Sequence, residues 1–151
     1  MRITTKGRYG LRAVINLAMA NHKRPISIGF IANEEKVSSE FLEQIFFKLK
    51  KAGLINSVRG PGGGFVLSRK PSEISVQNIL EAVGETGRLT PCTLKARTLC
   101  DRQEACPAHE IWNGLQQTME TYLSGITLKD IMDKRGKQLV SKLGAGQDFS
   151  I

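Results

Sequence analysis

The chain has 151 residues, of which 40% are hydrophobic and 24% are charged, a composition typical of one globular domain with short extensions. It contains no run of about eighteen apolar residues, which excludes a predicted membrane span, and its basic start does not resemble a secretory signal. Its three cysteines are an odd number, which argues against a disulfide framework. We therefore expect a protein of the reducing cytoplasm, with free thiols.

The net charge of +8 is carried entirely by the first half of the chain. Residues 1–75 contain thirteen Lys or Arg and five Asp or Glu, whereas residues 76–151 contain nine of each. A surface without a charged partner usually mixes its signs, so a basic half favours a polyanion, with nucleic acid ahead of a membrane surface.

Three helices are predicted before residue 53. The first covers residues 6–20, where apolar side chains recur at helical spacing: Leu11, Val14, Ile15, Ala18 and Met19. Ser27 is a favourable N-cap for a second helix over 28–36, and Ser38 for a third that ends before Gly53. The predicted buried stripe of the third helix is Leu42, Ile45, Phe46 and Leu49. A long helix followed by two short ones with a tight turn indicates a helix-turn-helix.

A two-stranded hairpin is predicted next, from the runs LINSV (54–58) and FVLSR (65–69) on either side of RGPGGG. A phosphate-binding loop is disfavoured because neither GK[ST] nor a helix follows the glycines. A plain flexible turn is one alternative. We favour a wing, in which Arg59 reaches a DNA groove and the small tip, beginning at Gly60, approaches phosphate closely.

The second half combines a short helix, a long irregular segment and a long helix. Ser75 is expected to cap a helix over 76–84, and the polar stretch 85–105 lacks hydrophobic periodicity. Pro107 then suits the start of a helix whose apolar stripe is Ile111, Leu115, Met119, Tyr122 and Ile126, with Trp112 beside it. Either an intrachain core or a second subunit could cover this stripe, and we favour a homodimer. Thr127 is expected to cap a short last helix, LKDIM. Residues 136–151 are expected to form a disordered tail.

Cys92, Cys100, Cys106 and His109 lie within eighteen residues of one another. Three thiolates and one imidazole form a complete ligand set for zinc, and equally for an iron-sulfur cluster in which histidine replaces one cysteine. Buried structural cysteines and a metal-free thiol switch are the alternatives. The spacing alone does not choose between zinc and a cluster.

Three segments together resemble the IscR/NsrR-type family of bacterial winged-helix transcription regulators. They are the start MRITTKGRYGLRAV, the run SSEFLEQIFFKLKKAGLINSVRGPGGGFVLSR and the cysteine loop, in this order over residues 1 to 135. The fold implied is mainly α with a small β-hairpin wing (α+β). Its expected parts are a winged helix-turn-helix domain (1–84), a cluster-binding loop (85–106), and a dimerisation helix with a short last helix (107–135).

The resemblance implies a homodimer on a pseudo-palindromic operator in double-stranded DNA, with the third helix in the major groove. The DNA-binding residues would be Ser38, Ser39, Glu43 and Gln44, with Arg59 and Gly60 on the wing. The side-chain chemistry agrees: Gln44 can pair with adenine, and Glu43 can accept only from the amino group of cytosine. The alternative is that these residues of the third helix form an ordinary solvated surface without a role in DNA binding.

The resemblance further implies a 2Fe-2S cluster held by the three cysteines and His109. Seven residues separate Cys92 from Cys100, where familiar members have five, and no acid precedes Glu34 that could replace a ligand from the first helix. Nothing in the sequence resembles an enzyme, because no catalytic triad, paired acids or nucleotide motif is present. In order, the hypotheses are a cluster-sensing repressor of iron-sulfur assembly genes, a nitric-oxide or redox-sensing repressor of the same fold, and a zinc-stabilised regulator.

Overall fold

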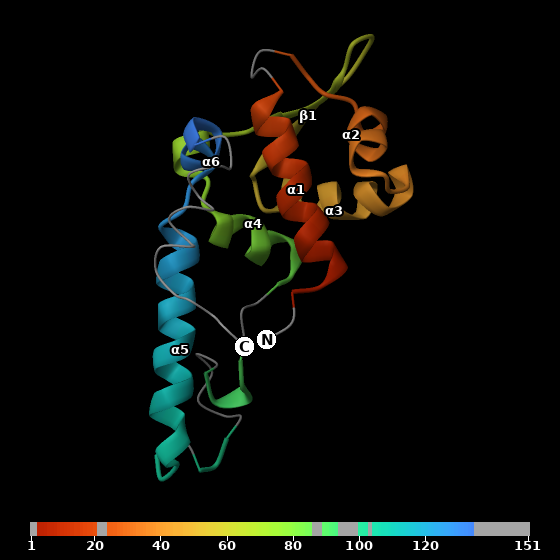
Figure 1. Cartoon of the computed structure of the whole chain (residues 1–151). Coiled ribbons are helices and arrows are strands. Elements are labelled where there is room, and N and C mark those ends of the chain that lie inside the picture. The colour runs from red at the N-terminus through yellow and green to blue at the C-terminus, as the bar shows by residue number, and fades with distance from the viewer. Residues whose placement is uncertain (1–2, 21–23, 86–88, 94–99, 103, 135–151) are drawn as a thin grey trace.

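The computed structural model describes residues 3–20, 24–85, 89–93, 100–102 and 104–134 (Figure 1). The elements are α1 (Thr5–Met19), α2 (Ile28–Glu35), α3 (Ser39–Lys51), β1 (Ile55–Val58), β2 (Gly64–Leu67), the 3-10 turn η1 (Pro71–Glu73), α4 (Val76–Val83), the 3-10 turn η2 (Pro91–Thr93), α5 (Pro107–Ser124) and α6 (Leu128–Lys134). The strands pair antiparallel, from Ile55 opposite Leu67 to Val58 opposite Gly64. None of the described helices is both long and apolar enough to cross a membrane. The mainly helical fold with one hairpin is as predicted.

Serine caps set the starts of three helices, as the sequence predicts. The Oγ atoms of Ser27, Ser38 and Ser75 accept hydrogen bonds from the backbone N–H three residues later, at 3.2, 3.1 and 3.1 Å. The cap of α4 is reciprocal, because the Ser75 N–H donates to Asn78 Oδ1 at 3.0 Å. Each cap satisfies a helical N–H that has no partner within its own helix.

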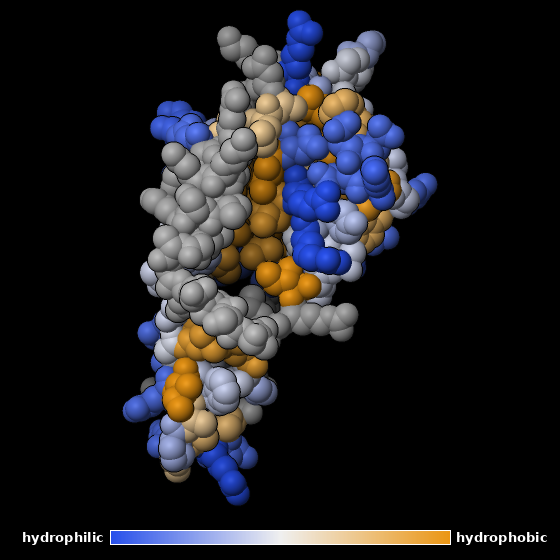
Figure 2. All heavy atoms as spheres, in the orientation of Figure 1, coloured by the Kyte–Doolittle hydropathy of each residue, from blue (hydrophilic) through white to orange (hydrophobic). Residues whose placement is uncertain are grey.

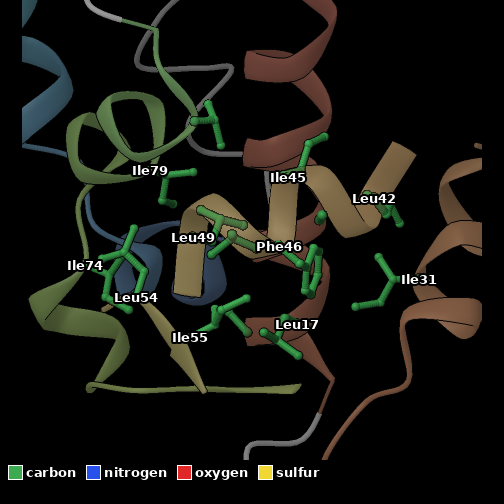
Figure 3. Close-up of a cluster of buried hydrophobic side chains, with 14 of the residues drawn as sticks. Leu17, Ile31, Leu42, Ile45, Phe46, Leu49, Leu54, Ile55, Ile74 and Ile79 are labelled. Carbon is green, nitrogen blue, oxygen red and sulfur yellow. The ribbon is translucent and has the colours of Figure 1, made fainter. Parts of the chain in front are cut away.

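The core lies where α1, α2, α3 and α4 meet, as the labelled side chains in Figure 3 show. The four predicted stripe residues of α3 are all buried, and Phe46 stacks edge-on against Phe65 of the wing at 4.8 Å between ring centroids. One prediction for α1 is wrong. Met19 is 57% exposed, because α1 turns Ala13 and Leu17 toward the core beside the predicted Val14 and Ala18.

The last helix, α6, packs back onto the winged part of the chain. Leu128 is fully buried in the same core as Ile74, and its N–H donates to the Ile74 carbonyl at 2.9 Å. The Val76 N–H donates in turn to the Ile126 carbonyl at 2.9 Å. Ile126 was predicted to extend the stripe of the long helix, which is wrong, because α5 ends at Ser124 and Ile126 lies in the connection held against Ser75 and Val76.

At Gly64 the backbone of the wing passes very close to the backbone of Ile26, in the segment before α2. Gly64 has φ +154°, and a Cβ there would lie 2.3 Å from the Ile26 carbonyl oxygen. The contact arises because Ile26 and Phe65 exchange two backbone hydrogen bonds, of 3.0 and 2.8 Å. The glycine is therefore required by the backbone path, and this contact anchors the base of the wing.

We expect Gly64→Ala to lower the free energy of unfolding by about 3 kcal/mol, because the substitution combines a glycine-only conformation with a backbone clash. Gly29→Ala is the matched control. Its site in α2 has open space around the added methyl group, so this variant should gain roughly 0.5 to 1 kcal/mol. Urea unfolding of both variants measures the difference, and equal stability of the two would contradict the assigned role of Gly64.

Candidate DNA-binding surface and cysteine loop

The outward face of α3 carries the residues that were predicted to read DNA. Glu43 and Gln44 are exposed, opposite the buried stripe, whereas Ser39 at the helix start is half-buried. Ser38 is exposed, but its hydroxyl oxygen accepts the capping bond from Phe41 N–H, which fixes its orientation. The N-terminal part of this face is therefore polar and open to solvent, and its first turn is held by the Ser38 cap.

The wing follows α3 directly in the chain, and in Figure 1 its tip extends past α2 toward the top of the view. Arg59 and Gly60 are exposed near its tip, where the Gly63 N–H donates to the Gly60 carbonyl at 2.9 Å and Gly60 adopts φ +103°. Lys50 of α3 donates from Nζ to Ser57 Oγ of β1 at 2.7 Å. This bond connects helix and wing, so that two candidate DNA-contacting elements keep a defined spacing.

Two basic residues of the first half, Arg12 and Lys48, are engaged within the chain. Arg12 pairs with the nearly buried Glu35 at 2.7 Å, joining α1 to α2, and its guanidinium lies 5.3 Å from the centre of the Tyr9 ring. Lys48 Nζ donates to the Val83 carbonyl at 3.1 Å, joining α3 to the C-terminal end of α4. A cation suits that helix end, where the carbonyl dipoles concentrate negative charge. These residues position the helix-turn-helix.

The candidate ligands lie near η2 and the start of α5, at the end of the molecule opposite the wing (Figure 1). Cys92, Cys100 and Cys106 are free thiols, all half-buried, and Cys92 Sγ lies 3.0 Å from Thr90 Oγ1. Cys106 and His109 line one open hollow of about 520 Å³. However, no three His, Cys, Asp or Glu side chains in the described ranges are close enough to hold a metal ion. The structure thus brings two of the four residues together, and the full ligand set stays a prediction.

One junction between the winged part and the cysteine loop was not foreseen. Glu85, the first residue of the predicted loop, accepts hydrogen bonds from the Thr4 N–H at 3.2 Å and from the Thr4 hydroxyl. Its side chain also lies so close to Gly7 that a Cβ there would be 2.6 Å from Glu85 Cγ. Glycine at position 7 was visible in the sequence, but no local pattern links it to a residue almost eighty positions away.

The long helix α5 projects from the body and leaves most of its apolar side chains uncovered (Figures 1 and 2). Its exposed fractions are 66% at Ile111, 39% at Trp112, 43% at Leu115 and 47% at Tyr122. Its one buried side chain is polar: Gln116 Oε1 accepts from Leu89 N–H at 3.3 Å, and Nε2 donates to Glu120 at 2.9 Å. Within the part of the chain that the structure describes, α5 thus has no apolar core of its own.

A capped α3 beside a β-hairpin, on a compact helical core, defines a winged-helix DNA-binding protein. A family model confirms this class and refines it. The Rrf2 model, described as an iron-dependent transcriptional regulator, matches residues 3–134. The chain therefore belongs to the Rrf2 family of transcriptional regulators, which are not enzymes, in agreement with the sequence.

Individual relatives agree with the family. The chain is 38% identical over 141 residues to the helix-turn-helix-type transcriptional regulator IscR of Aliivibrio salmonicida, covering 93% of this chain and 83% of that one. Among solved structures, T. potens IscR has a TM-score of 0.69 at 29% identity, covering 99% of this chain and 94% of that one. CymR, the global cysteine regulator of B. subtilis, has a TM-score of 0.71 at 29% identity, with 88% and 97% covered. The resemblance to IscR is therefore confirmed.

Proposed function

We propose that this protein is an iron-sulfur-sensing repressor that binds pseudo-palindromic operators as a homodimer and controls iron-sulfur cluster assembly genes. The observation that carries this proposal is the coexistence of a basic winged helix-turn-helix with three free cysteines and His109 around the start of α5. DNA binding alone does not require three thiols and an imidazole, so this donor set points to a bound metal or cluster.

DNA docking is argued from α3 and the wing. The exposed Gln44 and Glu43 suit base edges in the major groove, and the exposed Arg59 suits a narrow minor groove beside it. Ser38 and Ser39 lie at the N-terminal end of α3, where a helix offers unpaired N–H groups to phosphate. The glycines from Gly60 onward keep the wing tip small, which allows a close approach to the backbone.

The proposed homodimer covers the exposed face of α5. A dimerisation helix of this kind sets the distance between the two recognition helices of the dimer. This distance then matches the spacing of the two half-sites in a pseudo-palindromic operator. The stripe from Ile111 to Tyr122 is apolar enough to pair with its copy, and its projection from the body leaves it accessible.

The donor chemistry of the cysteine loop fits an iron-sulfur cluster. Three thiolates and one neutral imidazole supply four ligands, and a histidine ligand raises the reduction potential relative to four cysteines. When bound, such a cluster supplies a redox-active and labile group. Cys92, Cys100, Cys106 and His109 would hold it, most readily as the 2Fe-2S type.

A route from this loop to the DNA-binding surface is supported by the contacts at and just before the start of the loop. Val83 accepts from Lys48 of α3, and Glu85 accepts from Thr4 at the start of α1. Binding of the cluster by these ligands would act on this junction, and so bias how α3 sits in the groove.

Anaerobic isolation tests the proposal. We expect a coloured protein with about one 2Fe-2S cluster per chain, seen by absorption spectroscopy and by iron, sulfide and zinc analysis. Stoichiometric zinc without sulfide would identify a zinc-stabilised regulator and overturn the cluster. Loss of colour on exposure to nitric oxide, with no response of operator binding to cluster supply, would favour the nitric-oxide-sensing alternative.

A further inference from the structure

Phe47 of α3 is 69% exposed, more than any other large hydrophobic side chain in the described residues. It lies opposite the buried stripe that Figure 3 shows pointing into the core, on the same outward face as Glu43, Gln44 and Lys51. Single exposed apolar side chains are common on protein surfaces, but this ring lies on the face that is proposed to enter DNA, where a partner would cover it.

The surroundings of Phe47 indicate the charge of that partner. The ring borders an open hollow of about 650 Å³ between α3, the start of α1 and the end of α4, which is also lined by Lys6, Lys48 and Lys51. Lys48 is held by the Val83 carbonyl, whereas Lys6 and Lys51 are exposed, and Glu43 is the acidic member of the lining. Three ammonium groups around one apolar ring favour a polyanion with an apolar feature over an apolar protein surface.

DNA offers one such feature in the major groove. Among the groups on base edges there, the C5-methyl group of thymine is the apolar one, and phenylalanine is suited to contact it. Phe47 follows Glu43 and Gln44 by one helical turn, so it would lie farther along the same groove. We propose that Phe47 is a specificity-determining residue that packs against a thymine methyl group next to the bases read by Glu43 and Gln44. This inference rests on the proposed insertion of α3 into the major groove.

The test uses duplexes selected from a random pool by the wild-type protein. Each thymine of the selected half-site is then replaced in turn by uracil, which removes only the methyl group. We expect one position at which uracil weakens wild-type binding about fourfold, the loss for one buried methyl-sized group. Phe47→Ala should bind the thymine and uracil forms of that position equally. Phe30→Ala, which removes a half-exposed ring from α2, is the matched control and should keep the discrimination.

Three results would overturn the inference without bearing on the docking of α3. The first is an undiminished thymine preference in Phe47→Ala, and the second is wild-type binding that is indifferent to uracil at every position. The third is a change of oligomeric mass in DNA-free Phe47→Ala, which would assign the ring to a protein contact. Failure to select any duplex would overturn the docking of α3 itself, and the inference with it. Because the ring is exposed, an unchanged melting temperature of Phe47→Ala is expected and checks that the variant folds.

Discussion

Leu115→Glu in α5 is expected to turn the proposed homodimer into monomers and to weaken operator binding by about 10²-fold or more. Leu115 is 43% exposed in the middle of the apolar stripe of α5, so a carboxylate there would be buried against its own copy across the proposed interface. A monomer engages one half-site, and loses the gain in effective concentration that linked half-sites provide. Sedimentation of the free protein and fluorescence anisotropy with operator DNA, at one salt concentration, measure both effects.

Gln117→Glu is the matched control for this experiment. Gln117 is exposed on the opposite side of α5 from the stripe, so the variant adds the same charge outside the proposed interface. It should remain a dimer with nearly unchanged affinity. A Leu115→Glu protein that stays dimeric would place the dimer contact elsewhere, and equal weakening in both variants would attribute the loss to charge alone.

Cys106→Ala is expected to remove essentially all bound iron and sulfide, because three remaining donors leave one ligand position open. His109→Ala should leave a labile cluster, and His22→Ala, which changes the only other histidine, should leave the iron content unchanged. Metal and sulfide analysis after anaerobic isolation compares the three variants. A full cluster in Cys106→Ala would remove Cys106 from the ligand set.

The same variant tests how the cluster state selects operators. Cluster-free Cys106→Ala should keep one class of operator and lose another, because Glu43 is repelled by base acceptors unless a cytosine amino group meets it. Adding Glu43→Ala should then restore binding to the second class. If the double variant still discriminates as Cys106→Ala does, Glu43 is not the discriminating residue, and the coupling runs through dimer geometry instead.

Local sequence patterns were sufficient for the helices and the wing. The capping serines, the α3 stripe and the two strands around RGPGGG depend on residues within a few positions of each other, where side-chain chemistry acts directly on the backbone. The exposure of Glu43 and Gln44 follows from the same patterns, because the face opposite a buried stripe is exposed. Their role in reading DNA is what the family resemblance implies. For the cysteines and His109, the sequence predicts a ligand set by residue type alone.

Contacts between distant segments were decided only by the tertiary structure. No local pattern indicated that Leu128 would complete the core, that Met19 would be left exposed, or that Glu85 would accept hydrogen bonds from Thr4, 81 positions away. These outcomes depend on how whole helices pack, since packing selects which part of an amphipathic face is covered and where a loop returns to the body. For this reason the sequence alone predicts which face of α3 is exposed. The junction from Val83 to Glu85, which joins α3, α1 and the start of the cysteine loop, is visible only in the folded molecule.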